Sequence, residues 1–142
     1  MADAHPKFDV AVVTPDGDAF RGEAELLLIV PGAAGEIGVL ARHAPLVATL
    51  KAGSTRIHLG GGEVLELATG SGFFKVELDR AIALVDDAVD VKEIDGARAQ
   101  EQLEAAKAEL ERVEAGESTA DRWQLEQRLK HAENQLTVSG GR

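Results

Sequence analysis

Residues 55–68, TRIHLGGGEVLELA, carry the clearest structural signal in the chain. Two runs of alternating apolar and polar residues, Thr55 to Leu59 and Glu63 to Ala68, flank three consecutive glycines. Alternation with a period of two is typical of a strand with one buried face. Glycine readily adopts the positive φ angles that a tight hairpin loop needs. The stretch therefore predicts a β-hairpin closed by residues 60–62.

Further strand-like segments lie on both sides of this hairpin. They are short, apolar and bounded by Gly, Pro, Asp or Ser, and they cover residues 8–13, 25–30, 73–78 and 81–85. Many short strands at a spacing of roughly 8 to 12 residues favour a β-sandwich or a flattened barrel. No helical pattern separates the strands, which disfavours a parallel α/β sheet. We expect residues 1–91 to form a flattened β-sandwich domain.

After Glu93 the apolar residues recur with the period of a helix. They follow intervals of four and three, first at Ala99, Leu103, Ala106, Leu110 and Val113 and then at Leu125, Leu129, Ala132 and Leu136. Gly116 ends the first run, Ser118 is the predicted N-cap of the second, and residues 139–141 end it. Residues 92–142 are therefore predicted to form an antiparallel two-helix hairpin. Because each apolar stripe is narrow, we expect this hairpin to be a mobile, regulatory element or to need a partner.

Composition excludes several classes of protein. The 142 residues carry a net charge of −10, which opposes binding to nucleic acid or to an anionic membrane surface. With no Cys in the chain, disulfides and thiolate chemistry are excluded. No apolar run approaches the length of about 18 residues needed to cross a bilayer, and residues 1–10 lack the pattern of a signal peptide. We expect a protein of the bacterial cytoplasm with no nucleic-acid partner and no insertion into the bilayer.

The sequence offers no recognisable catalytic machinery. Its four histidines, His5, His43, His58 and His131, include no pair at metal-ligand spacing. Neither a nucleophile-elbow motif nor a phosphate-loop motif is present. The glycine-rich residues 70–75 lead into a strand, so they offer no helix N-terminus to a phosphate. We expect no catalytic residues, no bound metal and no cofactor.

Five stretches nevertheless resemble one known family. They are VPGAAGEIGVLARHAPL (30–46), FRGEAE (20–25), LKAG (50–53), GSGFFKVELDRAIALVDDA (70–88) and IDGARA (94–99). In this order and spacing they are similar to motifs of the epsilon subunit of bacterial F-type ATP synthase, and the resemblance covers roughly residues 7 to 136.

The resemblance implies a β-sandwich followed by a helical hairpin, in a non-enzymatic rotor subunit. The sandwich would bind the gamma subunit and rest on the polar loops of the c-ring, and so couple ring rotation to ATP synthesis. The hairpin would reach the alpha and beta subunits of the catalytic head. The chain would then be a peripheral protein on the cytoplasmic side of the bacterial plasma (inner) membrane.

The family's contact loop matches residues 30–46. Carried over by position, Glu36, Gly38 and His43 would contact the c-ring and gamma. A carboxylate between glycines can accept hydrogen bonds from a partner that approaches closely. The alternative is that the glycines only shape a turn, that Glu36 is only solvated, and that His43 bonds a nearby backbone carbonyl.

In some family members the stretch matched by residues 94–99 binds ATP. The corresponding positions here, together with a basic position in the second helix, are Asp95, Arg98, Ala99 and Arg122. Asp95 is also well placed to stabilise the start of a helix, and Arg98 to pair with a carboxylate. Arg122 extrapolates onto the apolar seam of the second helix. Because the chain departs from the nucleotide-binding pattern at Val89 and Ala105, ATP is expected to be at most a weak regulatory ligand.

The hairpin's other family role is inhibition of ATP hydrolysis, through basic residues that meet an acidic segment of the head. Residues 100–142 hold nine acidic and six basic residues. Like charges oppose docking, so we expect weak inhibition or none. One alternative function is a free-standing ATP sensor whose hairpin closes on the nucleotide. A hydrolase that uses Glu36 and His43 ranks third, because no nucleophile accompanies them.

Overall fold

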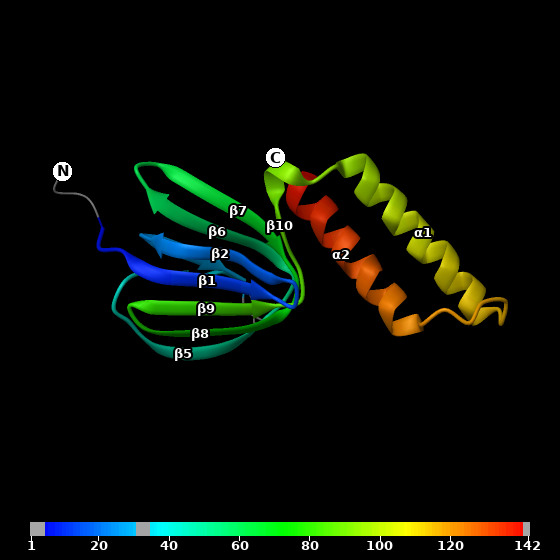
Figure 1. Cartoon of the computed structure of the whole chain (residues 1–142), viewed down its shortest axis with the longest axis horizontal. Helices are drawn as coiled ribbons and strands as arrows, with labels where there is room; N and C mark the ends of the chain where they lie inside the picture. The colour runs from blue at the N-terminus through cyan, green and yellow to red at the C-terminus, as the bar shows by residue number, and fades with distance from the viewer. Residues whose placement is uncertain (1–4, 31–34, 141–142) are drawn as a thin grey trace. The chain divides into compact units, whose positions relative to one another are not determined.

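Within its described residues, the computed structural model has ten strands, followed by a short 3₁₀ turn and two long helices. Figure 1 shows the course of the chain through these elements. The structure describes residues 5–30 and 35–140. The chain divides between Asp90 and Val91 into a β unit and a helical unit.

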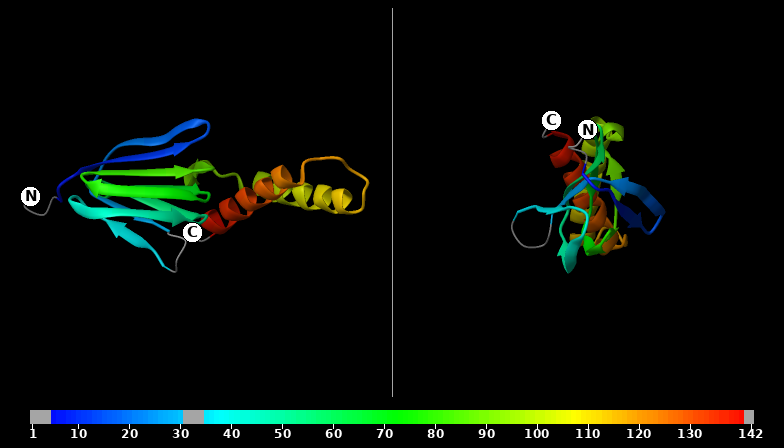
Figure 2. Two further views of the ribbon diagram at one scale, coloured as in Figure 1. Left: turned by 90° about the horizontal axis from the view of Figure 1, so that it is seen from below. Right: turned by 90° about the vertical axis from the view of Figure 1, so that its left-hand side faces the viewer.

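The β unit consists of two five-stranded sheets, whose layers are visible in Figure 2. The strands are β1 (Phe8–Thr14), β2 (Gly17–Ala24), β3 (Leu26–Ile29), β4 (Ile37–Val39), β5 (His43–Leu50), β6 (Gly53–Gly60), β7 (Glu63–Thr69), β8 (Gly72–Leu78), β9 (Arg80–Val85) and β10 (Ala88–Asp90). Sheet A has the order β2-β1-β9-β8-β5, and sheet B has the order β10-β7-β6-β3-β4. Among the strand pairs formed by the described residues, β1 and β9 are parallel and the others are antiparallel. The predicted β-sandwich is confirmed.

The hairpin predicted from residues 55–68 forms between β6 and β7 in sheet B. Residues 60–62 all have positive φ angles, of 110°, 62° and 83°. Along β6, the almost fully buried Thr55 and Ile57 alternate with more exposed residues, whereas the last three residues of β7 are all buried. Thr55 bonds the hydroxyl of Thr69 at 2.8 Å, so its buried polar atom is satisfied.

Four strands have no counterpart among the predicted segments: β2, β4, β5 and β10. These are the edge strands of the two sheets. An edge strand is paired on one side only, so its sequence need not carry a full apolar pattern. In β5 this position also explains Pro45, because a proline that donates no ladder hydrogen bond is tolerated at an edge. The pairing of β5 with β8 shifts register between His43 and Leu46, on either side of that proline.

The helical unit begins with a 3₁₀ turn (Val91–Glu93) and continues as α1 (Gly96–Glu114) and α2 (Arg122–Gly140). The two helices lie side by side and run in opposite directions (Figure 1). Their buried residues are those of the predicted seam: Ala99, Leu103 and Ala106 in α1, and Leu125 and Ala132 in α2. The predicted helical hairpin is confirmed. Of its predicted C-terminal stop at residues 139–141, residue 141 lies outside the described residues.

The predicted N-cap of the second helix is wrong. Asp121, not Ser118, caps α2: its carboxylate accepts from the backbone N–H groups of Trp123 at 2.9 Å and Gln124 at 3.3 Å. Ser118 lies further upstream, where its hydroxyl donates to the Glu109 carboxylate. Asp121 directly precedes the helix and carries two acceptor oxygens, so it reaches the unpaired N–H groups of the first turn.

Ser118→Ala is expected to raise the pKa of Glu109 towards its ordinary value. The Ser118 hydroxyl holds that pKa down; burial opposes this, and the charge and hydrogen bond of Arg112 add to it. Because the folded-state pKa is lowered, the contact stabilises the fold above the ordinary carboxyl pKa. That stabilisation is lost as the pH falls through the folded-state pKa. An NMR titration of the Glu109 carboxyl carbon measures the change, with Ser71→Ala as control; an unchanged pKa in Ser118→Ala would refute the prediction.

Candidate partner-binding surfaces

Glu36 directly precedes β4, at the edge of sheet B, and forms an ion pair. Nη2 of Arg56 donates to both of its carboxylate oxygens, at 2.8 and 2.6 Å. The Arg56 and Glu36 side chains are 38% and 41% exposed. The Glu36 carboxylate is thus partly exposed to solvent but bonded to Arg56, so it is not merely solvated. The preceding residues 31–34, which belong to the stretch 30–46 matched to the family's contact loop, lie outside the described residues.

Gly38 lies in the middle of β4 and is exposed. It pairs with Leu28 of β3, and an added Cβ would meet the Leu28 side chain at 3.4 Å. Gly35, in contrast, has a φ of 90°, a conformation that favours glycine. Of these two described glycines, Gly35 is the one that shapes the backbone, while Gly38 adds no side chain of its own to the exposed face of β4.

His43 is the first residue of β5, at the edge of sheet A. Its Nδ1 lies 2.6 Å from the carbonyl oxygen of Ala44, so the ring bonds a backbone carbonyl as the alternative interpretation held. Glu36 and His43 lie before and after β4, at the edges of different sheets. The structure does not bring these two residues together as one catalytic pair.

The outer face of sheet A carries a strip of exposed apolar side chains. Phe73 in β8 and Leu84 in β9 are 60% and 49% exposed and lie directly opposite each other. Val47 in the neighbouring β5 is 69% exposed. We refer to Val47, Phe73 and Leu84 as the apolar strip. Sequence reasoning missed it, although Phe73-Phe74 is a usable signal: in a strand, consecutive residues face opposite sides, so one phenylalanine must point outwards.

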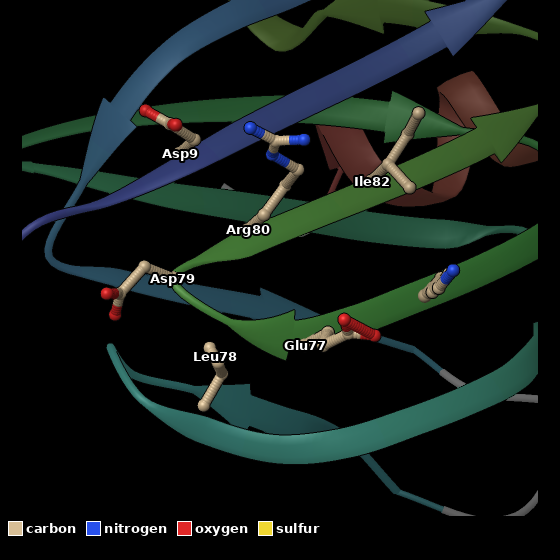
Figure 3. Close-up of a pocket in the computed structure, with 7 residues that line it drawn as sticks. Asp9, Glu77, Leu78, Asp79, Arg80 and Ile82 are labelled. Atoms are coloured by element: carbon tan, nitrogen blue, oxygen red, sulfur yellow. The ribbon is translucent and has the colours of Figure 1, made fainter.

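A charged hollow lies on the same sheet, where β8 turns into β9 (Figure 3). It has a volume of about 480 Å³ and is lined by Asp9, Lys75, Glu77, Leu78, Asp79, Arg80 and Ile82. Arg80 pairs in register with Asp9 on one side and Glu77 on the other. Asp79 also accepts from the backbone N–H of Arg42 at 3.1 Å, which ties the β4–β5 turn to this corner.

The four positions associated with ATP lie in the helical unit. Asp95 caps α1, because its carboxylate accepts from the backbone N–H of Arg98 at 3.2 Å. Ala99 is buried in the seam between the helices. Arg122 pairs with Glu114 at 3.1 Å and Glu126 at 3.2 Å. The expected place of Arg122 on the seam is wrong: its side chain is 58% exposed, since it is held by carboxylates on the outside of the hairpin.

Family models match both units in this order. The model described as "ATP synthase, Delta/Epsilon chain, beta-sandwich domain" matches residues 7–91, and the one described as "ATP synthase, Delta/Epsilon chain, long alpha-helix domain" matches residues 92–140. The chain belongs to the delta/epsilon family of ATP synthase subunits.

Individual relatives agree with this assignment. The ATP synthase epsilon chain of Halalkalibacterium halodurans is 36% identical over 135 residues, which cover 95% of this chain and 98% of that protein. The epsilon chain of a Cyanothece species is 34% identical over 132 residues, or 93% of this chain and 94% of its own. A solved structure of the mitochondrial ATP synthase of Euglena gracilis contains a chain with a TM-score of 0.68 at 25% identity, covering 92% of this chain and 80% of that one.

As a member of this family, the chain is an epsilon-type subunit of F-type ATP synthase and a non-catalytic accessory of that enzyme. The names of the relatives do not favour a free-standing ATP sensor. Within the described residues, neither α1 nor α2 is long and apolar enough to span a membrane.

Proposed function

We propose that the β unit binds the gamma subunit and the polar loops of the c-ring, and so couples ring rotation to ATP synthesis. The observation that carries this proposal is that the unit exposes two chemically different surfaces. One is the apolar strip of sheet A, and the other is the charged, glycine-containing edge of sheet B. The Euglena gracilis structure that contains the similar chain is an assembly of OSCP, F1 and the c-ring. The chain would then be peripheral, on the cytoplasmic side of the bacterial plasma membrane.

The gamma subunit is assigned to sheet A. Exposed apolar side chains on adjacent strands supply the desolvated centre that a stable protein interface needs. His43 begins β5, the strand that carries Val47 of the apolar strip. His43 is therefore proposed to contact gamma at the margin of this surface.

The c-ring is assigned to the edge of sheet B. Polar ring loops offer backbone and side-chain donors, and the Glu36 carboxylate can accept from them. Gly38, two residues further on and on the same face of β4, lets another backbone approach closely. Glu36 and Gly38 are therefore proposed to contact the ring.

Site-directed crosslinking tests this division. The chain has no Cys, so a single Cys can carry a photo-crosslinker at a chosen position. In the assembled enzyme, Glu36→Cys is expected to label the c subunit and Val47→Cys to label gamma. Labelling of alpha or beta from both positions, or an exchange of the two targets, would contradict the assignment.

The hairpin is proposed to reach the catalytic head without inhibiting it strongly. Removal of residues 92–142 is expected to change the ATPase rate of the whole enzyme by less than about twofold, because the acidic arm is repelled by an acidic target. Steady-state ATP hydrolysis at low and high salt measures this. Activation by several-fold, most evident at low salt, would refute it.

ATP is proposed to be a weak ligand of the helical unit. The Asp95 carboxylate is engaged by the start of α1 and the Arg122 guanidinium by two carboxylates, so binding of ATP would have to break existing contacts. Calorimetric titration of the full chain is expected to give a dissociation constant above about 1 µM. Submicromolar binding that Asp95→Asn or Arg98→Gln abolishes would favour an ATP-sensing role instead.

A further inference from the structure

A row of residues crosses the outer face of sheet B towards the proposed ring contact. Arg56 in β6 pairs in register with Leu28 in β3, and Leu28 pairs with Gly38 in β4. Glu36 lies two positions before Gly38. The order β6-β3-β4 means that the Arg56 side chain passes over β3 to reach Glu36. A Cβ at Gly38 would contact the side chains of Leu28 and Leu26, so glycine keeps this part of the face open.

The ion pair at the end of this row contributes little to folding. Both side chains are more than one-third exposed, and exposed pairs of this kind have small effects on stability. The effect of the pair is geometric. Without Arg56, the Glu36 carboxylate would follow the rotamers of a long side chain next to the conformationally permissive Gly35. When Arg56 is present, both Glu36 carboxylate oxygens accept hydrogen bonds from its Nη2 atom, which fixes their orientation.

The contact leaves hydrogen-bonding capacity on the Glu36 carboxylate. A carboxylate has about four acceptor sites, and the two bonds from Nη2 use one on each oxygen. On the arginine, Nε is buried and has no hydrogen-bond partner within the described part of the chain, so it offers no donor to a partner protein. The pair is therefore a held carboxylate with acceptor sites still available.

We propose that Arg56 is a positioning residue for the ring contact of Glu36. It holds the Glu36 carboxylate in the orientation in which its remaining acceptor sites meet hydroxyl or N–H donors of the polar ring loops. This inference rests on the proposed function, because it presupposes that Glu36 contacts the ring. Beyond that function, the inference states that the contact between Glu36 and the ring depends on Arg56 of β6, which acts on the ring through Glu36 and does not bind it directly.

The test compares binding of full-length variants to two preparations that lack the native subunit: the whole enzyme with its ring, and the head with gamma but no ring. Glu36→Gln and Arg56→Gln are each expected to weaken binding to the whole enzyme by about tenfold, which corresponds to the loss of one charge-assisted hydrogen bond. Binding to the ring-free head and the melting temperature of the isolated chain are expected to stay unchanged. ATP-driven proton pumping at limiting concentrations of the chain should fall in parallel.

Three further variants sharpen the result. Arg56→Lys, which keeps the charge but replaces the planar guanidinium with an ammonium on a different stem, is expected to retain part of the ring-dependent affinity. The charge exchange Glu36→Arg with Arg56→Glu restores an ion pair but removes the carboxylate from β4, so it is expected to fail like Glu36→Gln. The control is Arg21→Gln, which breaks the exposed Arg21–Asp18 pair at 2.7 Å in β2 and is expected to change neither affinity.

The outcomes separate the inference from the proposed function. If Glu36→Gln weakens ring-dependent binding and Arg56→Gln does not, the positioning role is refuted while the ring contact of Glu36 stands. If the charge exchange restores binding, an ion pair of either polarity between positions 36 and 56 is enough, and the role of the Glu36 carboxylate as the ring contact is not needed. The inference is then also refuted. If Glu36→Gln itself has no effect, the proposed ring contact fails.

Discussion

Phe73→Asp is expected to weaken binding of the chain to the gamma subunit by about 30-fold or more, with little change in the stability of the fold. The Phe73 side chain is 60% exposed and lies between Leu84 and the neighbouring β5 strand, at the centre of the apolar strip. Aromatic residues at the centre of an interface contribute about 2 to 4 kcal/mol. A buried, unpaired carboxylate at the same place adds a desolvation penalty.

Equilibrium binding to the ring-free head measures this effect, and urea denaturation of the isolated chain checks the fold. The matched control is Val64→Asp in β7 of sheet B, where the native side chain is also exposed, at 39%. Its affinity for gamma is expected to stay within about twofold of the parent, as for a surface change outside the interface. If Phe73→Asp binds gamma as tightly as the parent chain, sheet A does not form the gamma contact.

Phe74→Ala, one residue further along β8, is expected to act mainly by lowering the stability of the fold and not by removing a contact with gamma. The Phe74 side chain is 1% exposed and belongs to the core between the sheets. Removal of a buried phenylalanine ring costs about 3 to 5 kcal/mol in the free energy of unfolding. Since domains of this kind are stable by about 5 to 15 kcal/mol, the variant is expected to be marginally folded.

Urea denaturation of Phe73→Ala and Phe74→Ala makes the comparison direct, because both remove the same ring from the same strand. Phe73→Ala is expected to stay within about 1 kcal/mol of the parent, as for an exposed residue. Equal losses from the two variants would mean that the two faces of β8 are wrongly assigned.

The central strands of the sandwich were predictable from sequence and the edge strands were not. Residues 55–68 carry the alternation and the glycines that define the β6–β7 hairpin. A strand such as β2, in contrast, is polar along most of its length and lies at an edge of sheet A. Local periodicity reports burial on one face, and an edge strand shows only part of that pattern.

The sequence identified individual residues of the candidate site but not the contacts that those residues make. Glu36, Gly38 and His43 could be named from a family resemblance, but their neighbours depend on sheet order. Arg56 is 20 residues from Glu36 in sequence and meets it only because β3 lies between β4 and β6. Ser118 is a similar case, because its hydroxyl is engaged by Glu109 of the preceding helix and not by the helix it was expected to cap.

The most direct test of the central claim is recovery of partners with the tagged full-length chain from gently solubilised bacterial membranes. We expect gamma and the c subunit to be recovered with the chain in fixed ratio, and Phe73→Asp to recover much less of both. Recovery of the parent chain without gamma and without the c subunit would contradict its proposed place between the ring and the stalk.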